Sequence, residues 1–333
     1  MNILLTGGLG YIGSHTAITL AEAGHQILLL DNLSNSDTSI LIYLEKIIGK
    51  KIIFIEGDVR DKILVSNIFQ QHAIDAVIHF AGLKSVHESM HNPMKYYDHN
   101  VNGSLNLIKV MEEHQVKKIV FSSSATVYGE PVYLPYDESH PTHPINVYGH
   151  TKLVVEQMLT DLTHSDPAWS VAILRYFNPV GAHESGLIGE KPQGIPNNLM
   201  PYLTQVASGK LKVLRIFGDN YDTRDGTGER DYIHVMDLAE GHLAALQFIR
   251  TSQGCYKINL GSGQSTSVLE LINAFEKVNH QKIPYEFTDR RQGDLPAYYA
   301  KADLAAEILQ WNTSRSIESM CESAWLWEKN NVK

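Results

Sequence analysis

The stretch Thr6-Gly7-Gly8-Leu9-Gly10-Tyr11-Ile12-Gly13 follows a short apolar run, residues 2–6, and precedes a helical pattern. Glycines between a strand and a helix allow a tight turn, let the backbone approach a pyrophosphate, and let the helix pack closely on the strand. The first turn of that helix offers free N–H groups and a partial positive charge to phosphate. The spacing is G-x-x-G-x-x-G, which a glycine-rich structural turn would also show. A dinucleotide site therefore needs support from residues further along the chain.

Asp31 gives that support, because it ends the next apolar run about 18 residues past the glycine loop. A carboxylate there accepts hydrogen bonds from the adenosine ribose hydroxyls and repels a 2′-phosphate, so NAD is favoured over NADP. A simple turn residue before Asn32 is the alternative interpretation. Asp58-Val59 and Phe80-Ala81-Gly82 follow later apolar runs, at the strand ends where ligands bind in parallel sheets.

The N-terminal half alternates short apolar runs with longer amphipathic ones, which predicts βαβ units and a parallel sheet. The short runs are rich in Ile, Val and Leu with little alternation, as expected of strands covered on both faces. The predicted strands are residues 2–6, 26–31, 51–56, 76–80, 118–123 and 170–177, and the clearest helices are 93–114 and 146–163. We therefore predict an α/β fold, a doubly wound parallel sheet of Rossmann type over residues 1–177.

Residues 178–333 follow another pattern, because Gly and Pro become frequent over 178–201 and 218–228. Short predicted strands are mixed with helices here, which indicates a smaller C-terminal α/β lobe that binds substrate. The strands are 212–217, 255–259 and 283–287, and the helices are 235–249 and 268–279. We expect residues of about 230–250 to return to the first domain, and residues 171–177 fit either part.

The composition excludes several other classes of protein. The 333 residues carry a formal net charge of −9, which argues against a nucleic-acid partner, since a phosphate backbone needs a basic face. Cys255 and Cys321 lack C-x-x-C spacing and the 16 histidines lack metal-ligand spacing, so we expect neither a disulfide nor a metal. The first strand starts at Asn2 and every apolar run is short, so we expect a cytoplasmic protein without signal peptide or membrane partner.

Tyr148-Gly149-His150-Thr151-Lys152 places a phenol and an ammonium four residues apart, on one face of a predicted helix. A free phenol has a pKa of about 10, so its ionisation to the basic phenolate at pH 7 costs roughly 4 kcal/mol. A neighbouring ammonium and a cationic nicotinamide ring both favour the phenolate, which could then take a proton from a substrate hydroxyl. Ser124 is a suitable hydroxyl partner for the oxygen of that substrate hydroxyl. A buried Tyr beside a solvated Lys gives the same spacing, so the glycine loop and Asp31 are what favour catalysis.

In this order, the residues resemble the extended short-chain dehydrogenase/reductase family, and further stretches resemble its UDP-sugar 4-epimerases over essentially the full chain. The matching stretches are residues 6–15, 79–84, 122–129, 175–179, 196–201, 226–228, 230–234 and 293–298. The resemblance implies NAD-dependent 4-epimerisation of UDP-galactose and UDP-glucose, a reaction of galactose metabolism, by a homodimer. Tyr148 would remove the proton of the sugar 4-hydroxyl while C4 gives its hydride to NAD. The 4-keto sugar would then turn and take the hydride back on its other face.

The resemblance also implies site residues. NAD contacts are expected at Gly7, Gly10, Tyr11, Ile12, Gly13, Asp31, Asn32, Leu33, Ser34, Asn35, Ser36, Asp58, Val59, Phe80, Ala81, Gly82, Leu83, Lys84, Asn100, Ser124, Tyr148, Lys152 and Phe177. UDP-sugar contacts are expected at Lys84, Ser124, Ala125, Thr126, Tyr148, Asn178, Asn198, Leu199, Phe217, Arg230, Arg291, Asp294 and Tyr298. From the residues alone, either arginine could equally sit in a surface salt bridge. Arginine suits a diphosphate because its fork donates charge-assisted hydrogen bonds.

Tyr298 matches a position that limits room around the sugar 2-substituent, which predicts a preference for UDP-glucose and UDP-galactose. His99 stands where relatives often have Asn, and His87 and Arg215 replace smaller residues beside substrate-lining positions. A sugar-nucleotide 4,6-dehydratase usually has Asp-Glu after the serine, whereas Ala125-Thr126 follows Ser124 here. Epimerases of UDP-N-acetylglucosamine, UDP-glucuronate or UDP-arabinose are the nearer alternatives. A non-enzymatic binding module is a further one, although such proteins typically lose the Tyr or the Lys.

Overall fold

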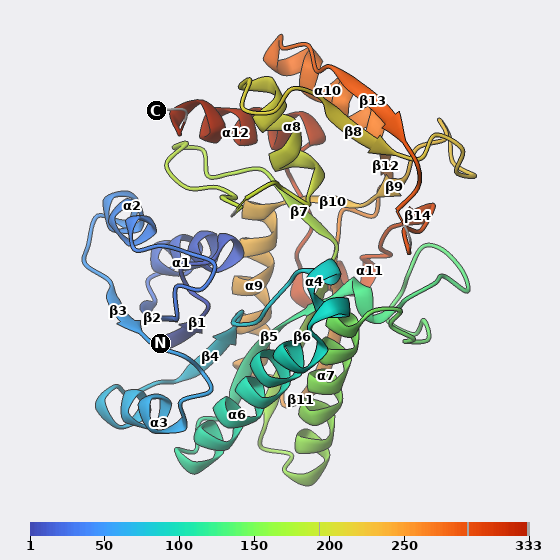
Figure 1. The fold of residues 1–333 in the computed structure, drawn as a ribbon. Helices are drawn as coiled ribbons and strands as arrows, with labels where there is room; N and C mark the ends of the chain where they lie inside the picture. The colour runs from blue at the N-terminus through green and yellow to red at the C-terminus, as the bar shows by residue number, and fades with distance from the viewer. Residues whose placement is uncertain (193, 292, 332–333) are drawn as a thin grey trace.

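A computed structural model describes residues 1–192, 194–291 and 293–331 of the chain (Figure 1). Among these residues, seven parallel strands form a central sheet in the order β11-β6-β5-β4-β1-β2-β3. The strands are β1 (Asn2–Thr6), β2 (Gln26–Asp31), β3 (Ile53–Glu56), β4 (Ala76–His79), β5 (Lys118–Ser124), β6 (Ser170–Tyr176) and β11 (Gly254–Leu260). The doubly wound α/β sheet predicted from the sequence is therefore confirmed.

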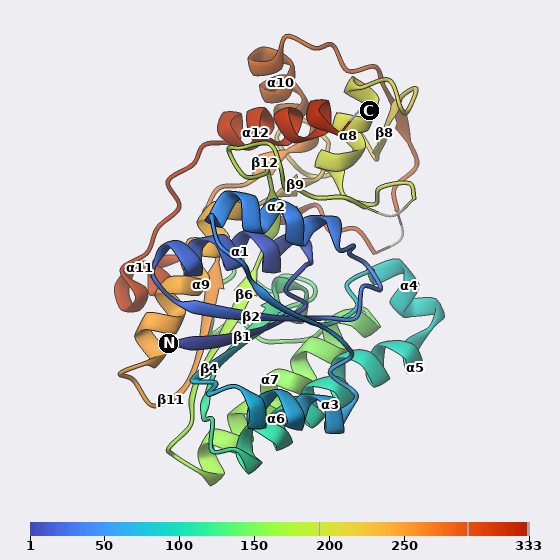
Figure 2. The same cartoon turned by 90° about the vertical axis from the view of Figure 1, so that its left-hand side faces the viewer.

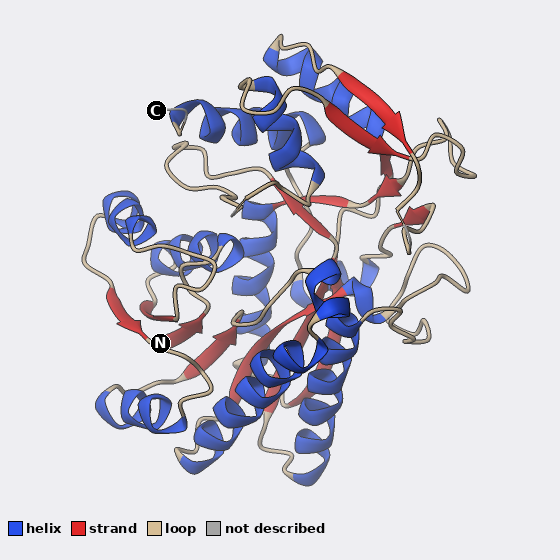
Figure 3. Ribbon diagram, viewed as in Figure 1, coloured by secondary structure: helices blue, strands red, loops and turns tan. Residues whose placement is uncertain are grey.

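Helices cover both faces of this sheet, as Figures 2 and 3 show. On one face lie α1 (Tyr11–Glu22), α2 (Ser39–Ile48), α9 (Val235–Ile249) and α11 (Asp303–Leu309), and on the other α3 (Lys62–Gln71), α6 (Gly103–Glu113) and α7 (Val147–Ser165). Consecutive strand residues point to opposite faces, so Leu4 and Leu5 are both fully buried but belong to different cores. This explains the unbroken apolar runs in the sequence.

The long helix predicted over residues 93–114 is interrupted in its middle. α4 (Val86–His91) is followed by α5 (Pro93–Tyr96), a π-helical segment η1 (Tyr97–Asn102), and then α6. The wider turn of η1 places Asn100 against the loop after β4, and such π-helical turns are frequent at functional sites. An apolar period predicts a helix but not a local change of its hydrogen-bond pattern, so the sequence did not predict η1.

Residues 255–259, predicted as a strand of the smaller lobe, lie in β11 at the edge of the central sheet, paired with β6. That prediction was wrong. A short apolar run indicates a strand but does not say which sheet it joins. Here α9 decides, because it packs against α1, β5 and β6 and carries the chain back to the sheet.

The remaining elements form a second layer above the carboxyl edge of the sheet (Figure 1). Its helices are α8 (Leu199–Ala207), α10 (Val268–Asn279) and α12 (Ile317–Asn330), and its strands are β7 (Asn178–Val180), β8 (Leu214–Phe217), β9 (Glu229–Arg230), β10 (Tyr232–His234), β12 (Thr266–Ser267), β13 (Tyr285–Thr288) and β14 (Ala297–Tyr298). Leu203, Phe275 and Trp325 belong to a core of its own. None of the helices that the structure describes is long and apolar enough to cross a membrane.

A buried ion pair ties α7 to β6 behind the carboxyl edge. Arg175 donates to both carboxylate oxygens of Glu156, at 2.9 and 2.5 Å, and Ser123 Oγ donates to the same carboxylate at 2.5 Å. The side chains are 2% and 0% exposed, so removal of one partner would leave a buried charge unpaired.

We predict that Arg175→Met lowers the free energy of unfolding by about 3–5 kcal/mol, measured by urea denaturation. The control is Arg215→Met, which removes the ion pair with Glu286 on the exposed faces of β8 and β13. Those side chains are 59% and 51% exposed, so the loss should stay below about 1 kcal/mol. Equal, small losses in both variants would contradict the role of the buried pair.

Candidate active site

A cavity of about 2120 Å³ lies between the carboxyl edge of the sheet and the second layer. It brings together nearly all the residues singled out in the sequence, from the glycine loop to Tyr298. Among the described residues, Leu33, Asn100 and Ala125 are the predicted site residues outside its lining. The lining also includes residues that the sequence analysis did not single out, notably Tyr176, Glu190 and Tyr221.

The glycine loop has the close backbone approach that its sequence suggests. Gly7 has a φ of +69°, and a Cβ there would lie 2.8 Å from the backbone nitrogen of Ala81. A Cβ on Gly13 would lie 2.4 Å from the Gly7 carbonyl oxygen, so a side chain would distort the turn. α1 starts directly after Gly10, and no described side chain caps its N-terminus. The first turn of α1, which lines the cavity, thus keeps free N–H groups and suits a pyrophosphate.

Asp31 lies at the end of β2 and folds the next loop around its carboxylate. Oδ2 accepts from the N–H of Leu9 at 3.0 Å, and Oδ1 accepts from the N–H of Leu33 at 2.9 Å and from Ser36 Oγ at 2.8 Å. Leu33 thus supports the loop from outside the cavity lining. Asp31 lines the cavity with Asn32, Ser34 and Asn35, as a ribose site requires.

Tyr148 and Lys152 both line the cavity, on the first turns of α7. Lys152 Nζ donates to the carbonyl oxygen of Ser122 at 2.7 Å and lies 5.8 Å from the centre of the Tyr148 ring. Ser124 Oγ accepts from the N–H and the hydroxyl of Thr126, at 3.2 and 3.0 Å. The phenol, the hydroxyl and the ammonium therefore line one end of the same cavity.

The pKa values of this pair differ from the expectation set by the sequence. Burial raises the pKa of Tyr148 to about 12, although interaction with Ser124 lowers it. Burial lowers the pKa of Lys152 to about 8, and the negative charge of Glu156 opposes that change. At neutral pH the ammonium therefore keeps its charge, whereas the polypeptide alone does not ionise the phenol. The desolvation of the buried phenolate outweighs the hydrogen bond with Ser124.

A buried network that the sequence analysis missed connects this end of the cavity to the glycine loop. His79 lies between Thr6 Oγ1, 2.6 Å from Nδ1, and Ser104 Oγ, 2.8 Å from Nε2. Ser104 in turn donates to the carbonyl oxygen of Asn100 at 2.5 Å. Burial, followed by the charge of Lys152, lowers the pKa of His79 to about 3, so this histidine is a neutral hydrogen-bonding bridge.

Asn100 extends the network from η1 to α7. Its Oδ1 accepts from the N–H of Leu83 at 2.8 Å, and its Nδ2 donates to the Leu83 carbonyl and to Thr151 Oγ1, both at 3.0 Å. Thr151 Oγ1 donates to the carbonyl oxygen of Tyr148 at 2.7 Å. Asn100 thus holds the loop after β4 against the helix that carries Tyr148. An Asn in a helical pattern gives no sign of this role in the sequence.

The second layer supplies cations and aromatic rings to the cavity. The guanidinium of Arg291 lies 3.7 Å from the centre of the Phe217 ring. Arg230 Nη1 donates to the carbonyl of Leu295 at 2.9 Å, which fixes the loop that carries Asp294. Asn198 precedes α8, whose N-terminus is capped by none of the described side chains. These groups suit a second anionic ligand.

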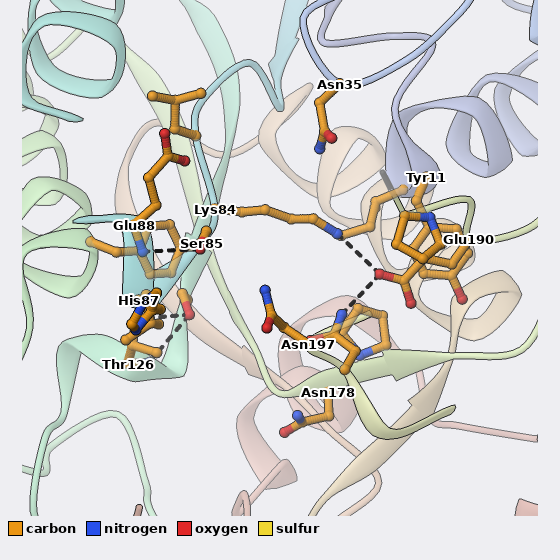
Figure 4. Close-up of a pocket in the computed structure, with 18 of the residues that line it drawn as sticks. Tyr11, Asn35, Lys84, Ser85, His87, Glu88, Thr126, Asn178, Glu190 and Asn197 are labelled. Carbon is orange, nitrogen blue, oxygen red and sulfur yellow. Dashed lines mark hydrogen bonds and ion pairs between the residues drawn. The ribbon is translucent and has the colours of Figure 1, made fainter. Parts of the chain in front are cut away.

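Figure 4 shows a contact across the cavity that the sequence did not predict. Lys84, in the loop after β4, points at Glu190 of the second layer, and its Nζ lies 3.1 Å from Glu190 Oε1. The same oxygen accepts from Asn198 Nδ2 at 2.8 Å. Isolated Glu residues in loops carry no recognisable motif, so nothing in the sequence marked Glu190.

His87, His99 and Arg215, the three residues that depart from the family pattern, all line the cavity. The His87 ring lies 4.6 Å from that of His91, and His99 Nδ1 lies 2.8 Å from the carbonyl of Lys95. Arg215 pairs with Glu286 at 3.3 Å. None of the groups of His, Cys, Asp and Glu in the described part of the chain could hold a metal ion.

Comparisons with known proteins agree on one family. The sequence model of a family described as GDP-mannose 4,6 dehydratase matches residues 4–324. The chain is 55% identical to a UDP-glucose 4-epimerase of Neisseria meningitidis serogroup C over 330 residues, covering 99% of this chain and 97% of that protein.

Two solved structures are also very similar. The UDP-glucose 4-epimerase of Bifidobacterium longum in complex with NAD+ and UDP has a TM-score of 0.96 at 50% identity, with 99% of both chains covered. The UDP-glucose 4-epimerase of Stenotrophomonas maltophila, with bound NAD and formylated UDP-arabinopyranose, has a TM-score of 0.98 at 48% identity, covering 99% of this chain and 98% of that one.

We predict that Gly13→Ala folds but loses most of its bound NAD, because the new Cβ would meet the Gly7 carbonyl at 2.4 Å. The measurement is the NAD released on denaturation of purified protein, relative to wild type. Gly24→Ala is the control, since a Cβ there meets open space at the far end of α1. Its positive φ costs about 1 kcal/mol of stability without touching the loop. Equal NAD content in the two variants would argue against a pyrophosphate at this turn.

Proposed function

Because the chain belongs to the UDP-glucose 4-epimerases of the extended short-chain dehydrogenase/reductase family, we infer that it interconverts UDP-glucose and UDP-galactose with bound NAD. The observation that carries this inference is the cavity. Its lining contains two different sites that suit anions, together with Tyr148 and Lys152. The glycine loop and Asp31 suit NAD, and the arginines and α8 suit the diphosphate of a nucleotide sugar. Tyr148 and Lys152 lie where the two ligands would meet.

Tyr148, Ser124 and Lys152 would together transfer one proton from the substrate and stabilise the group that accepts it. Tyr148 takes the proton of the sugar 4-hydroxyl, and Ser124 donates a hydrogen bond to the same oxygen. Lys152 contributes a fixed positive charge that favours the phenolate. Bound NAD supplies the hydride acceptor, and then the donor, at the sugar C4. Burial raises the pKa of Tyr148 to about 12, so the charge of Lys152 would have to act together with that of a nicotinamide ring, if one is bound beside it, to favour the phenolate.

Dehydration is excluded by the residues after Ser124, although the matching family model is described as GDP-mannose 4,6 dehydratase. Loss of water from the sugar needs an acid and a base beside C5 and C6. Ala125 is fully buried, and the Thr126 hydroxyl is already hydrogen-bonded to Ser124 Oγ. This short segment, η2 (Ala125–Val127), thus carries no carboxylate for such a step.

Tyr298 supports a preference among UDP-hexoses. Its ring lines the cavity and packs against Phe177 and Tyr136, at 4.9 and 5.6 Å between ring centres. These contacts leave the ring little freedom to swing away from a bulky 2-substituent. We predict efficient turnover of UDP-galactose and at least about tenfold slower turnover of UDP-N-acetylglucosamine, measured as kcat/KM. Tyr298→Ser should narrow this gap, and comparable wild-type values for both sugars would contradict the role of Tyr298.

Tyr148→Phe tests the proton transfer directly. The variant should retain its fold and its NAD, because the Tyr148 side chain lines the cavity and the hydrogen bond that affects the pKa of its phenol is with Ser124, within the same site. We predict that kcat for UDP-galactose falls by roughly 10²-fold or more, the usual contribution of a positioned base. Conversion to UDP-glucose is measured without external NAD, with Tyr299→Phe as the control. Near wild-type turnover in Tyr148→Phe would refute Tyr148 as the base.

We also propose a homodimer and a cytoplasmic location. Met94, Tyr97 and Val154 expose apolar side chains on α5, η1 and α7, which a second copy would cover. Both cysteines are free in the structure, as a reducing compartment favours. Sedimentation at the mass of one chain would contradict the dimer, and recovery of the activity outside the cytoplasmic fraction would contradict the location.

A further inference from the structure

Glu190 places a negative charge on the wall of the cavity, beside two groups that suit a phosphate, Lys84 and the N-terminus of α8. Its side chain is 11% exposed, and its Oε1 accepts from Lys84 Nζ, as Figure 4 shows, and from Asn198 Nδ2. The ammonium and the amide come from opposite walls, one after β4 and one before α8. A single carboxylate oxygen therefore holds two donors that lie on either side of the cavity.

The backbone around Glu190 fixes this position. Trp327 Nε1, on α12, donates to the carbonyl oxygen of Glu190 at 3.1 Å. Gly189 lies against the same indole, because a Cβ there would come within 2.5 Å of the Trp327 ring. An antiparallel bridge joins Gly189 to Ala182. The carboxylate is thus presented by a built support rather than by a free loop.

The groups that Glu190 engages are those that a diphosphate would engage. An ammonium, an amide N–H and an uncapped helix N-terminus all favour an anion. Asn198 immediately precedes the uncapped α8, so the carboxylate lies at the positive end of that helix. Glu190 also lies beside Tyr11 of the glycine loop, but Asn198 and α8 belong to the second layer with Arg230 and Arg291, so we assign this anion site to the nucleotide sugar. The glycine loop and α1 form the other site.

We propose that Glu190 competes with the diphosphate of the nucleotide sugar for Lys84 and Asn198. The proposal rests on the proposed function, since it assumes that a UDP-sugar enters this cavity. On entry, the two donors turn from the carboxylate to the diphosphate, and the charge of Glu190 then lies close to the ligand's own. Glu190 thereby weakens the binding of UDP-sugars and speeds their release. A reversible epimerase that keeps NAD but exchanges its sugar nucleotide at every turnover gains from this selective weakening.

The experiment is a calorimetric titration of UDP into the purified NAD-bound enzyme and its Glu190→Gln variant. Glutamine keeps the acceptor oxygen for Lys84 and Asn198, so the support and the fold are preserved, but it removes the charge. We expect Kd for UDP to fall roughly five- to tenfold at low salt, and this gain to shrink at high salt. The gain should appear as slower dissociation in stopped-flow measurements.

The control is Glu184→Gln, which removes the same charge from the same segment. Glu184 is exposed and is not part of the described lining of the cavity. Its Kd for UDP should change by less than about twofold. NAD content and the rate of NAD release should be unchanged in both variants.

Two results would overturn the proposal. UDP affinity in Glu190→Gln that is equal to or weaker than wild type would mean that Glu190 supports the donors rather than competing for them. Altered NAD release with unaltered UDP affinity would mean that Glu190 acts on the cofactor. A wild-type enzyme that lacks NAD or does not bind UDP would instead contradict the proposed function, whatever the variant does.

Discussion

The buried ammonium of Lys152 is the charge around which the reactive end of the cavity is arranged. A buried charge is costly unless it is hydrogen-bonded and near an opposite charge, and burial lowers the pKa of Lys152 to about 8 although the charge of Glu156 opposes this change. The carbonyl of Ser122 accepts from the ammonium at 2.7 Å, the Phe121 ring lies 5.0 Å away, and Glu156 lies one helical turn further along α7. Arg175 donates a hydrogen bond to Glu156 in turn. The contacts that stabilise the fold therefore also hold the carboxylate that influences the charge of Lys152.

Burial, with a smaller contribution from the same charge, explains why His79 is not a competing base. Together they lower its pKa to about 3, so the neutral ring bridges Thr6 and Ser104. Through Asn100 this bridge reaches the start of α7. One hydrogen-bond network therefore positions both the end of β1, which leads into the glycine loop, and α7, the helix that carries Tyr148. This shared network fixes the position of the base relative to the cofactor site, and catalysis by proximity requires such fixed positions.

The sequence predicted what is contiguous in the chain. The glycine loop, Asp31 and the Tyr148–Lys152 pair are local patterns, and the apolar runs predicted most strands of the sheet because each strand is buried on both faces. Contacts between distant segments were not predictable in this way. The return of β11 to the sheet depends on how α9 packs, η1 depends on a side chain that bonds a loop 17 residues away, and Glu190 meets Lys84 across 106 residues. The pKa of Tyr148 is raised by burial, and the four-residue spacing of Tyr148 and Lys152 in the sequence does not reveal how deeply the phenol is buried.

We infer that Tyr148 becomes a base only when a second positive charge, that of bound NAD, joins the charge of Lys152. The most direct measurement is the ultraviolet absorbance of tyrosinate as a function of pH, for the NAD-bound enzyme, the NAD-free enzyme and NAD-bound Tyr148→Phe. The account predicts one tyrosine in the NAD-bound enzyme that ionises well below the ordinary pKa of about 10. That ionisation should be absent from Tyr148→Phe and should move to higher pH when NAD is removed. A low-pH tyrosinate signal that persists in Tyr148→Phe, or that does not depend on NAD, would contradict the account.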